Sequence, residues 1–338
     1  MTGDVARYRE GGVIDRVTGD QVRLREGGFL DHDRGRVERY RDGGSIEQSS
    51  GDRVKLRQGG LLEKVRGQIA KYRDGGIAEI LKGKVARFRD GGMVDRVTGD
   101  QIRLREGGRI DREGGNVSRY REGGRIERIR GSVFKSREGS VIDKLTGTIS
   151  RLKLGGTVDK VTGDQVRLRE GGLLERVTGD TLRFRKGGTI DSKTGDTVKL
   201  REGGSLDKAV GTRLKLREGG TIDRATGDQV RLREGGLLTR EVGDTVKLKI
   251  GGTLDKVTGD TVRLREGGYL SRIRGDTVKL REGGTVDRAT GDIFKLREGG
   301  RIDKATGDQV RLREGGRIEK TYGDRVSLKE GSTMDRVS

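Results

Sequence analysis

The stretch Gly11–Gly28, GGVIDRVTGDQVRLREGG, contains one complete copy of a pattern that returns every 16 residues along the 338-residue chain. We number the repeat positions 1 to 16 from the first glycine of the GG pair, so that Gly11 occupies position 1 and Glu26 occupies position 16. Positions 1 and 9 are glycine in all 21 copies, without any insertion. Such a fixed period predicts a repeat architecture in which each copy forms one structural unit.

The composition separates this chain from ordinary globular proteins. Hydrophobic residues make up 29% of the sequence, charged residues make up 38%, and the formal net charge is +20. Such a balance is typical of disorder, but a small apolar set that recurs at the same positions builds a thin, continuous core instead. The sequence has no cysteine and no apolar run long enough for a membrane span, so we expect neither disulfides nor membrane insertion.

Two short strands are predicted in each repeat. Positions 12 and 14 are mostly apolar and alternate with basic positions 13 and 15, as in QVRLRE, and this period of two indicates a half-buried strand. Position 4 is apolar in every copy and belongs to the second strand, while the glycines mark the turns. The expected apolar packing stripe consists of positions 4, 12 and 14, represented by Ile14, Val22, Leu24, Ile222, Val230 and Leu232.

Two all-β architectures fit this repeat. We expect an elongated antiparallel β-meander of 21 two-strand repeats, forming a single continuous array over residues 1–338 without capping domains. The alternative is a β-solenoid with one coil per repeat, in which equivalent strands stack in parallel. Charge favours the meander, because it places position 5, acidic in 19 copies, beside position 13, basic in 20 copies. The solenoid would instead stack like charges about 4.8 Å apart.

The turn chemistry also favours hairpins. The segment IDRATGDQVRL (Ile222–Leu232) contains a D-x-x-T-G pattern that resembles the hairpin element of quinoprotein-type β-propellers. The resemblance implies a loop over positions 7 to 9 that ends on a glycine in the left-handed conformation. The period of 16 is similar to that of bacterial ice-nucleation proteins, but their T-x-T motifs are missing here, so only the period is shared.

Several early repeats depart from the pattern by carrying an aromatic residue at position 14 and, in all but one of them, valine at position 11 instead of 12. The aromatic residues are Tyr8, Tyr40, Tyr72, Phe88 and Tyr120. We interpret them as a repacking of the apolar seam around a larger ring, and a distinct docking surface in this half of the chain is the alternative.

Catalytic and metal-dependent functions are not expected. The single histidine, His32, stands at position 6, where most repeats carry Arg or Lys, and we interpret it as a surface substitution. Carboxylates recur in every copy, whereas an active site is normally unique, so we predict no enzyme activity and no cofactor. The GG pairs and aspartates resemble calcium-binding nonapeptide repeats, but the third glycine of that motif is absent.

The leading functional expectation is a structural subunit of a self-assembling β-rich filament or fibre. The sequence begins at repeat position 7 and ends at position 8, so each end would supply the strand that the other lacks. Open strand edges template pairing with another chain, and a head-to-tail contact between identical chains gives a filament. The expected polymer joint consists of Gly3, Asp4, Val5, Ala6 and Arg7 with Thr333, Met334, Asp335, Arg336 and Val337.

Lateral contacts between chains are a further expectation of the meander. A single-layer sheet would expose the apolar stripe, and two or more chains would have to pack together to cover it, as in viral fibre shafts. An extracellular or virion appendage is favoured by this analogy alone. The first residues show no signal-peptide pattern.

The alternative function is a basic repeat scaffold that binds a polyanion, either nucleic acid or acidic polysaccharide. The net charge of +20 and the rows of arginine at positions 13 and 15 would attract phosphate, carboxylate or sulfate groups. An aromatic content of 3% disfavours stacking on nucleobases. The candidate polyanion face consists of Arg103, Arg105, Arg167, Arg169, Arg231, Arg233, Arg311 and Arg313.

Overall fold

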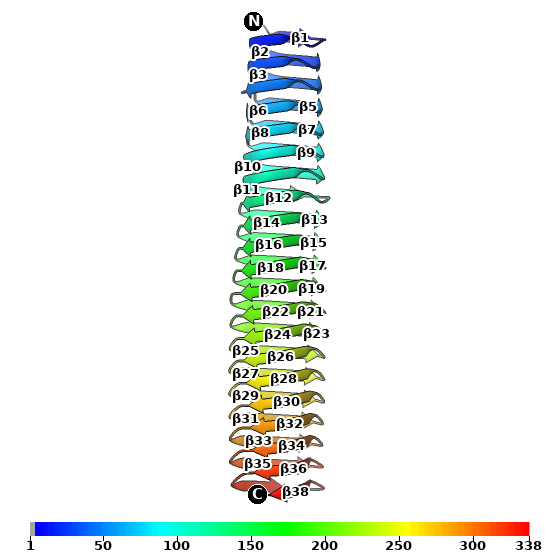
Figure 1. Cartoon of the computed structure of the whole chain (residues 1–338), viewed down its shortest axis with the longest axis vertical. Helices are drawn as coiled ribbons and strands as arrows, with labels where there is room; N and C mark the ends of the chain where they lie inside the picture. Colours follow the sequence, from blue (N-terminus) through cyan, green and yellow to red (C-terminus); the bar gives the residue numbers. More distant parts are fainter. Residues whose placement is uncertain (1–3, 338) are drawn as a thin grey trace. The chain divides into compact units, whose positions relative to one another are not determined.

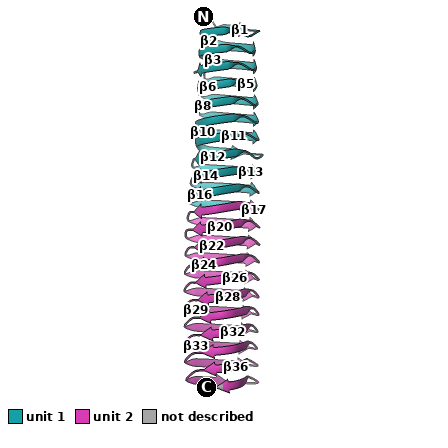
Figure 2. Cartoon of the chain, viewed as in Figure 1, with its two compact units in different colours: residues 1–167 teal, residues 168–338 magenta. Residues whose placement is uncertain are grey.

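The computed structural model describes residues 4–337, which form 38 strands and no helix. The chain divides into two compact units, residues 1–167 and residues 168–338 (Figure 2). Within each unit, every 16-residue repeat makes one coil of a parallel β-solenoid, and successive coils stack on one another (Figure 1). The boundary between the units falls inside strand β17 (Gln165–Glu170).

Most coils contribute two strands of six residues, and a few early coils form one continuous strand of 12 or 14 residues. The first unit contains β1 (Val5–Tyr8), β2 (Val13–Glu26), β3 (Phe29–Asp42), β4 (Ser45–Ser49), β5 (Arg53–Gln58), β6 (Leu61–Arg66), β7 (Ile69–Asp74), β8 (Ile77–Lys82), β9 (Val85–Asp90), β10 (Met93–Glu106), β11 (Arg109–Tyr120), β12 (Arg125–Arg130), β13 (Val133–Glu138), β14 (Val141–Thr146), β15 (Ile149–Leu154) and β16 (Thr157–Thr162).

The second unit repeats the two-strand coil throughout. It contains β18 (Leu173–Thr178), β19 (Thr181–Lys186), β20 (Thr189–Thr194), β21 (Thr197–Glu202), β22 (Ser205–Val210), β23 (Arg213–Glu218), β24 (Thr221–Thr226), β25 (Gln229–Glu234), β26 (Leu237–Val242), β27 (Thr245–Ile250), β28 (Thr253–Thr258), β29 (Thr261–Glu266), β30 (Tyr269–Arg274), β31 (Thr277–Glu282), β32 (Thr285–Thr290), β33 (Ile293–Glu298), β34 (Arg301–Thr306), β35 (Gln309–Glu314), β36 (Arg317–Tyr322), β37 (Arg325–Leu328) and β38 (Thr333–Val337).

Equivalent strands of successive coils pair in parallel, with an offset of one repeat. In the first unit, Leu24 of β2 lies opposite Tyr40 of β3. In the second unit, Val262 of β29 lies opposite Val278 of β31. The antiparallel meander is therefore wrong, and the alternative, a parallel solenoid with one coil per repeat, is the architecture of each unit.

Burial of the apolar side chains explains why the solenoid is preferred. Each coil has two walls, one formed by positions 3–8 and the other by positions 11–16, and both walls point side chains into the space between them. In one coil of the second unit, Leu254, Val257, Val262 and Leu264 are all at most 2% exposed. Burying one such side chain contributes about 1.5–3 kcal/mol, whereas a cross-strand ion pair contributes about 1 kcal/mol or less. Core burial outweighs the charge pairing that favoured the meander.

Position 7 is a core position, although the sequence placed it in a hairpin loop. Val17, Val97 and Val177 occupy this position and are fully buried. The 3–8 wall bends at position 5: the register between β14 and β16 joins positions 3, 4, 6, 7 and 8 and skips position 5. Because of this bend, positions 4 and 7 both point inward, while positions 5 and 6 both point outward.

Glycine serves two different purposes in the turns. At position 1 the backbone is left-handed, with φ of +44° at Gly155 and +53° at Gly267, which glycine adopts without strain. At position 9 the reason is close stacking, since a Cβ on Gly163 would lie 1.9 Å from the carbonyl oxygen of Gly147 one coil earlier. The left-handed glycine expected at position 9 from the propeller-like hairpin is therefore absent at Gly163.

The aromatic residues of the early repeats lie in the core. Tyr72 and Phe88 stack on each other, with ring centroids 4.8 Å apart and planes inclined by 15°. Their coils carry small residues, Ala70 and Ala86, at position 12. Phe134 shows the reverse arrangement, with the ring at position 12 and serine at position 14. A large side chain at one inward position is thus accommodated by a small one at the other.

Candidate functional site

The most distinctive surface feature is a row of cations at position 13, which we call the basic ladder. Because the coils stack in register, each of these side chains lies directly beside its counterpart one coil away. In the first unit the register joins Arg7, Arg23, Arg39, Lys55, Lys71, Arg87, Arg103, Arg119, Lys135 and Arg151. In the second unit it joins Arg183, Lys199, Lys215, Arg231, Lys247, Arg263, Lys279, Lys295 and Arg311.

Local strand geometry directs the ladder outward. Successive side chains of a strand point to opposite faces, so burial of positions 12 and 14 turns position 13 toward solvent. In β25, Val230 and Leu232 are buried and Arg231 between them is exposed. Neighbouring ladder residues are then separated by the spacing of paired strands, about 4.8 Å.

Several ladder arginines have a neutral hydrogen-bond acceptor as their partner in the described part of the chain. Where position 11 is glutamine, its side-chain oxygen accepts a hydrogen bond from the arginine at position 13, over distances of 2.8–3.3 Å. The arginines held in this way are Arg23, Arg103, Arg167, Arg231 and Arg311. Glutamine fixes the guanidinium without neutralising its charge.

The basic ladder has no ion-pair partner within the described part of the chain. None of its Lys or Arg side chains lies within 4.0 Å of a carboxylate oxygen of residues 4–337. Partial burial, followed by repulsion from Lys199 and Arg231, lowers the pKa of Lys215 below its usual value. The pKa of Lys55 is lowered by the same two causes. The ladder is therefore a stack of mutually repelling cations.

The second row of arginines, at position 15, is different. Nine arginines of this row pair with the glutamate that follows them at position 16 of the same coil. The Nε–Oε1 distances are 3.8 Å for Arg105–Glu106, 4.0 Å for Arg169–Glu170, 3.6 Å for Arg233–Glu234 and 3.8 Å for Arg313–Glu314. Of the eight arginines on the candidate polyanion face, the four at position 13 keep an unpaired charge, and these four at position 15 are paired.

The cross-strand pairing expected between positions 5 and 13 does not occur. Position 5 lies on the 3–8 wall, across the core from the basic ladder, and some of its carboxylates pair with arginines of their own wall. Arg109 at position 3, for example, pairs with Asp111 at 3.1 Å and with Glu127 of the next coil at 3.3 Å. The 3–8 wall thus contains ion pairs between its own residues in some coils, whereas the basic ladder has none among the described residues.

The predicted apolar stripe lies inside the coils. Val22, Leu24, Ile222, Val230 and Leu232 are at most 7% exposed, while Ile14 in the first coil is half-buried. The chain covers this stripe with its own second wall. The reason for expecting lateral packing of apolar faces is therefore absent.

Apart from Gly3, which is outside the described residues, and Asp4, the residues of the expected polymer joint lie on the first and last strands. Asp4 precedes β1, whose residues Val5, Ala6 and Arg7 pair with β2. Thr333, Met334, Asp335, Arg336 and Val337 form β38, which pairs with β36. Ala6 and Met334 occupy core positions but are only half-buried, since the described residues place a neighbouring coil on one side of each.

Buried ionisable groups form a feature that sequence reasoning missed. Four are at position 7, namely Asp33, Glu113, Lys193 and Glu241, and Glu38 is at position 12. Their signal is a charged residue at a position that is apolar in most copies, but the hairpin interpretation places position 7 in a loop.

The carboxyls of the first unit have hydroxyl partners. Tyr40 donates a hydrogen bond to Asp33, and Ser49 donates one to Glu38. Burial raises the pKa of Asp33 to about 6. Burial and the nearby charge of Asp33 raise the pKa of Glu38 to about 8. Burial likewise raises the pKa of Glu113 to about 7.

The two buried ionisable groups of the second unit differ in their partners. Lys193 donates hydrogen bonds to the carbonyl oxygens of Gly179 and Thr194, and burial lowers its pKa to about 8. Glu241 has no hydrogen-bond partner for either carboxyl oxygen, and burial raises its pKa to about 8. Both residues reduce the stability of the core at the pH where they would carry a charge.

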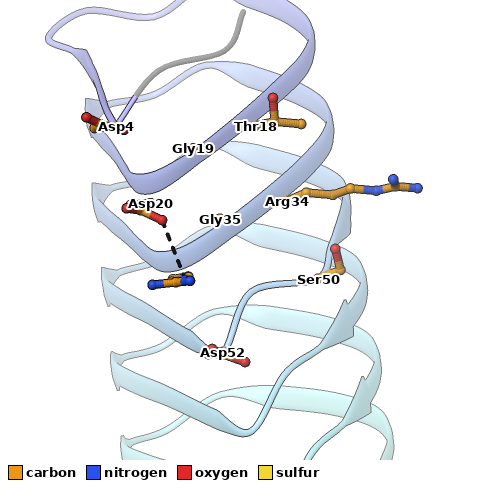
Figure 3. A pocket seen from close by; sticks show the side chains of 9 residues that line it. Asp4, Thr18, Gly19, Asp20, Arg34, Gly35, Ser50 and Asp52 are labelled. Atoms are coloured by element: carbon orange, nitrogen blue, oxygen red, sulfur yellow. Dashed lines mark ion pairs between the residues drawn. The ribbon is translucent and has the colours of Figure 1, made fainter.

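An open pocket lies at the TGD corners of the first coils (Figure 3). Asp4, Asp20 and Asp52 line it, with Arg36 between them, and Arg36 pairs with Asp20 at 3.6 Å. Over residues 4–337 there is no cluster of side chains suited to hold a metal ion. The same residues include no helix with the length and apolar character of a membrane span.

Comparisons with known proteins returned no match, whether to family models, to curated proteins or to solved structures.

Proposed function

We propose that this chain is a β-solenoid scaffold that binds a linear polyanion along its basic ladder. The observation that carries the proposal is the in-register stack of position-13 cations, none of which has a carboxylate partner among the described residues. Like charges directly opposite on paired strands are destabilising. An anionic polymer laid along the ladder would place a counter-charge beside each cation and remove this repulsion.

The affinity of such a complex would come from many weak contacts. A single solvent-exposed ion pair contributes about 0–1 kcal/mol. The ladder of the second unit offers nine cations in one row, from Arg183 to Arg311. A polymer that contacts several of them releases its condensed counterions, so the logarithm of the binding constant should fall steeply and linearly with the logarithm of the salt concentration.

A triple charge removal tests whether the ladder is the binding surface. Three adjacent ladder residues are replaced in the variant Arg231→Gln, Lys247→Gln, Arg263→Gln. The matched control removes the same three charge types from the opposite wall of the same region. Its substitutions are Arg240→Gln, Lys256→Gln and Arg272→Gln, at exposed residues of position 6.

Binding of fluorescein-labelled heparin is measured by anisotropy over a range of salt concentrations. We expect the ladder variant to lose about tenfold or more in affinity. The slope of the logarithm of its binding constant against the logarithm of salt concentration should fall by the equivalent of about three contacts. The control variant should lose much less, because it changes the net charge without changing the ladder. Equal losses in the two variants, or no heparin binding by the wild-type chain at low salt, would refute the proposal.

Polymerisation by stacking of coils is a second candidate function, and the open edges of the terminal strands favour it. β1 pairs with β2 alone and β38 with β36 alone, among the described residues. In a parallel solenoid, like positions stack on like positions. Val5 of one chain would therefore lie on Arg325 of β37 in another, and Thr333 would lie against Val13. This register replaces the hairpin joint expected from the sequence.

Electron microscopy of the purified chain tests this second candidate. The variant Met334→Lys puts a charge at a half-buried core position of the last coil, and it should abolish any elongation. The control Met93→Lys changes an exposed methionine at position 3 and should leave elongation intact. Dispersed wild-type particles at high protein concentration would exclude the filament.

A further inference from the structure

We infer that the polyanion is an acidic polysaccharide with one carboxylate per sugar, bound in extended form with about one sugar per coil along the basic ladder. This inference rests on the proposed function and adds the class of ligand. Three properties of the ladder wall carry it: the spacing of the cations, the chemistry of the row beside them and the placement of the exposed aromatic side chains.

The spacing of the ladder matches a regular, extended polymer. The ladder offers one cation per coil, at intervals of about 4.8 Å along the stacking direction. An extended chain of sugar acids advances by a similar distance per residue and carries one carboxylate on each. Carboxylates on the side of the polymer that faces the ladder can therefore meet cations at a matching spacing. Arginine adds a planar fork that matches a carboxylate with two hydrogen bonds.

In the second unit, neutral hydrogen-bonding groups occupy most places of the row beside the ladder on the same wall. Position 11 is two residues before position 13, so both side chains point to the same face of the strand. In the second unit this row includes threonine hydroxyls and glutamine amides that are half-buried, at Thr181, Thr197, Gln229, Thr245, Thr261, Thr277 and Gln309. Hydroxyl and amide groups recognise sugar hydroxyls and ring oxygens. The two parallel rows thus provide both kinds of contact that a sugar acid requires.

Nucleic acids fit the same wall less well. Proteins hold single-stranded nucleic acids largely by stacking the bases on exposed aromatic rings. The large aromatic side chains exposed in the described chain are Phe29, Tyr269 and Tyr322, which occupy positions 3 and 8 on the other wall. Duplex DNA presents a phosphate about every 3.4 Å on each strand, and its strands wind around the helix axis. A ladder that follows the coil stack would meet only a few phosphates before the strand turns away.

A threonine substitution separates recognition of sugar from recognition of charge. The variant Thr245→Val, Thr261→Val, Thr277→Val removes three adjacent hydroxyls of position 11 and leaves every ladder charge in place. The control Thr226→Val, Thr258→Val, Thr290→Val makes the same change at exposed residues of position 8. Both variants retain β-branched side chains of nearly the same shape, so the strands should be preserved.

Binding of polygalacturonate, inorganic polyphosphate, poly(dT) and duplex DNA is compared by competition at one salt concentration, with polymers matched in total charge. We expect polygalacturonate to bind most tightly among the four. The position-11 variant should lose about fivefold or more of its affinity for polygalacturonate, through the lost hydrogen bonds, and retain its affinity for polyphosphate. The position-8 control should retain both affinities.

Other outcomes distinguish failure of this inference from failure of the proposed function. Tighter binding of polyphosphate, poly(dT) or duplex DNA than of polygalacturonate would overturn the polysaccharide and leave the ladder as a polyanion site. An unchanged polygalacturonate affinity in the position-11 variant would also overturn it. Failure of all four polymers to bind at low salt would overturn the proposed function itself.

Discussion

Glu241 provides a quantitative test of the coil interior. Its side chain is 2% exposed, and neither carboxyl oxygen has a hydrogen-bond partner. It stacks in register between Ala225 and Val257, which occupy the same core position in the neighbouring coils. Replacement of Glu241 by valine should therefore fill the position with the side chain that the next coil carries, and should stabilise the second unit.

The size of the effect depends on pH. Burial raises the pKa of Glu241 from 4.5 to about 8, so the folded chain binds a proton that the unfolded chain releases. The stability that the protonated Glu241 allows is fully present below pH 4.5, and it is lost as the pH rises to about 8. At about 1.4 kcal/mol per pH unit, the loss is about 3 kcal/mol at pH 7 and about 5 kcal/mol above pH 8. Glu241→Val should avoid this loss, so its advantage over the wild type should grow with pH by these amounts.

The assay is urea unfolding followed by circular dichroism between pH 4 and pH 9. Hydrogen exchange of the amides in β26 (Leu237–Val242) reports the free energy of local unfolding, because part of a repeat array can unfold while the rest stays folded. Glu234→Gln is the matched control, since it removes a carboxyl that is 45% exposed and lies outside the core. An advantage of Glu241→Val that is constant with pH would refute the reasoning, because it would mean that the carboxyl is not buried in its charged form.

Two further predictions test how the coils stack. Gly163→Ala should destabilise the chain by about 3 kcal/mol, since the added methyl would overlap a carbonyl of the previous coil. The control Gly139→Ala should be nearly neutral, because nothing lies within 4 Å of its added Cβ. Thermal unfolding compares the two variants, and equal melting temperatures would contradict the prediction. The double variant Thr245→Cys, Thr261→Cys should form a disulfide on oxidation, because these residues are register neighbours at about 4.8 Å and the described chain has no cysteine to compete. Mass spectrometry detects the bond, and two free thiols after oxidation would be inconsistent with the parallel register.

The existence and approximate ends of the strands were predictable from the sequence, but their direction was not. Alternation in segments such as QVRLRE specifies an inward face and an outward face in either architecture. The choice between architectures depends on which strand lies next to which, and local charge pairing pointed to the wrong neighbour. Val257 carries the sequence signal that favours the solenoid, because an apolar residue at position 7 adds a fourth inward side chain. Four inward positions per repeat are enough to enclose a core.

The candidate site was predictable residue by residue, but not as an arrangement. Arg231 and Arg233 look equivalent in the sequence, since both are outward-facing strand residues. Only the structure shows that Arg233 pairs with Glu234 at 3.6 Å, while Arg231 is held by the neutral side chain of Gln229 at 3.3 Å. The sequence could not separate the two rows, because in a regular strand Arg233 and Glu234 would point to opposite faces and would not be expected to pair.

The titration of Lys215 tests the central claim, that the basic ladder is a stack of unpaired cations that a polyanion neutralises. NMR of the chain with isotope-labelled lysine gives the pKa of this side chain with and without saturating polygalacturonate. We predict a pKa below the ordinary value of 10.5 in the free chain, because of partial burial and the neighbouring cations Lys199 and Arg231, and a rise on addition of the polymer. A pKa at or above 10.5 in the free chain would contradict the stacked ladder, and a lowered pKa that the bound polymer leaves unchanged would place the polyanion elsewhere.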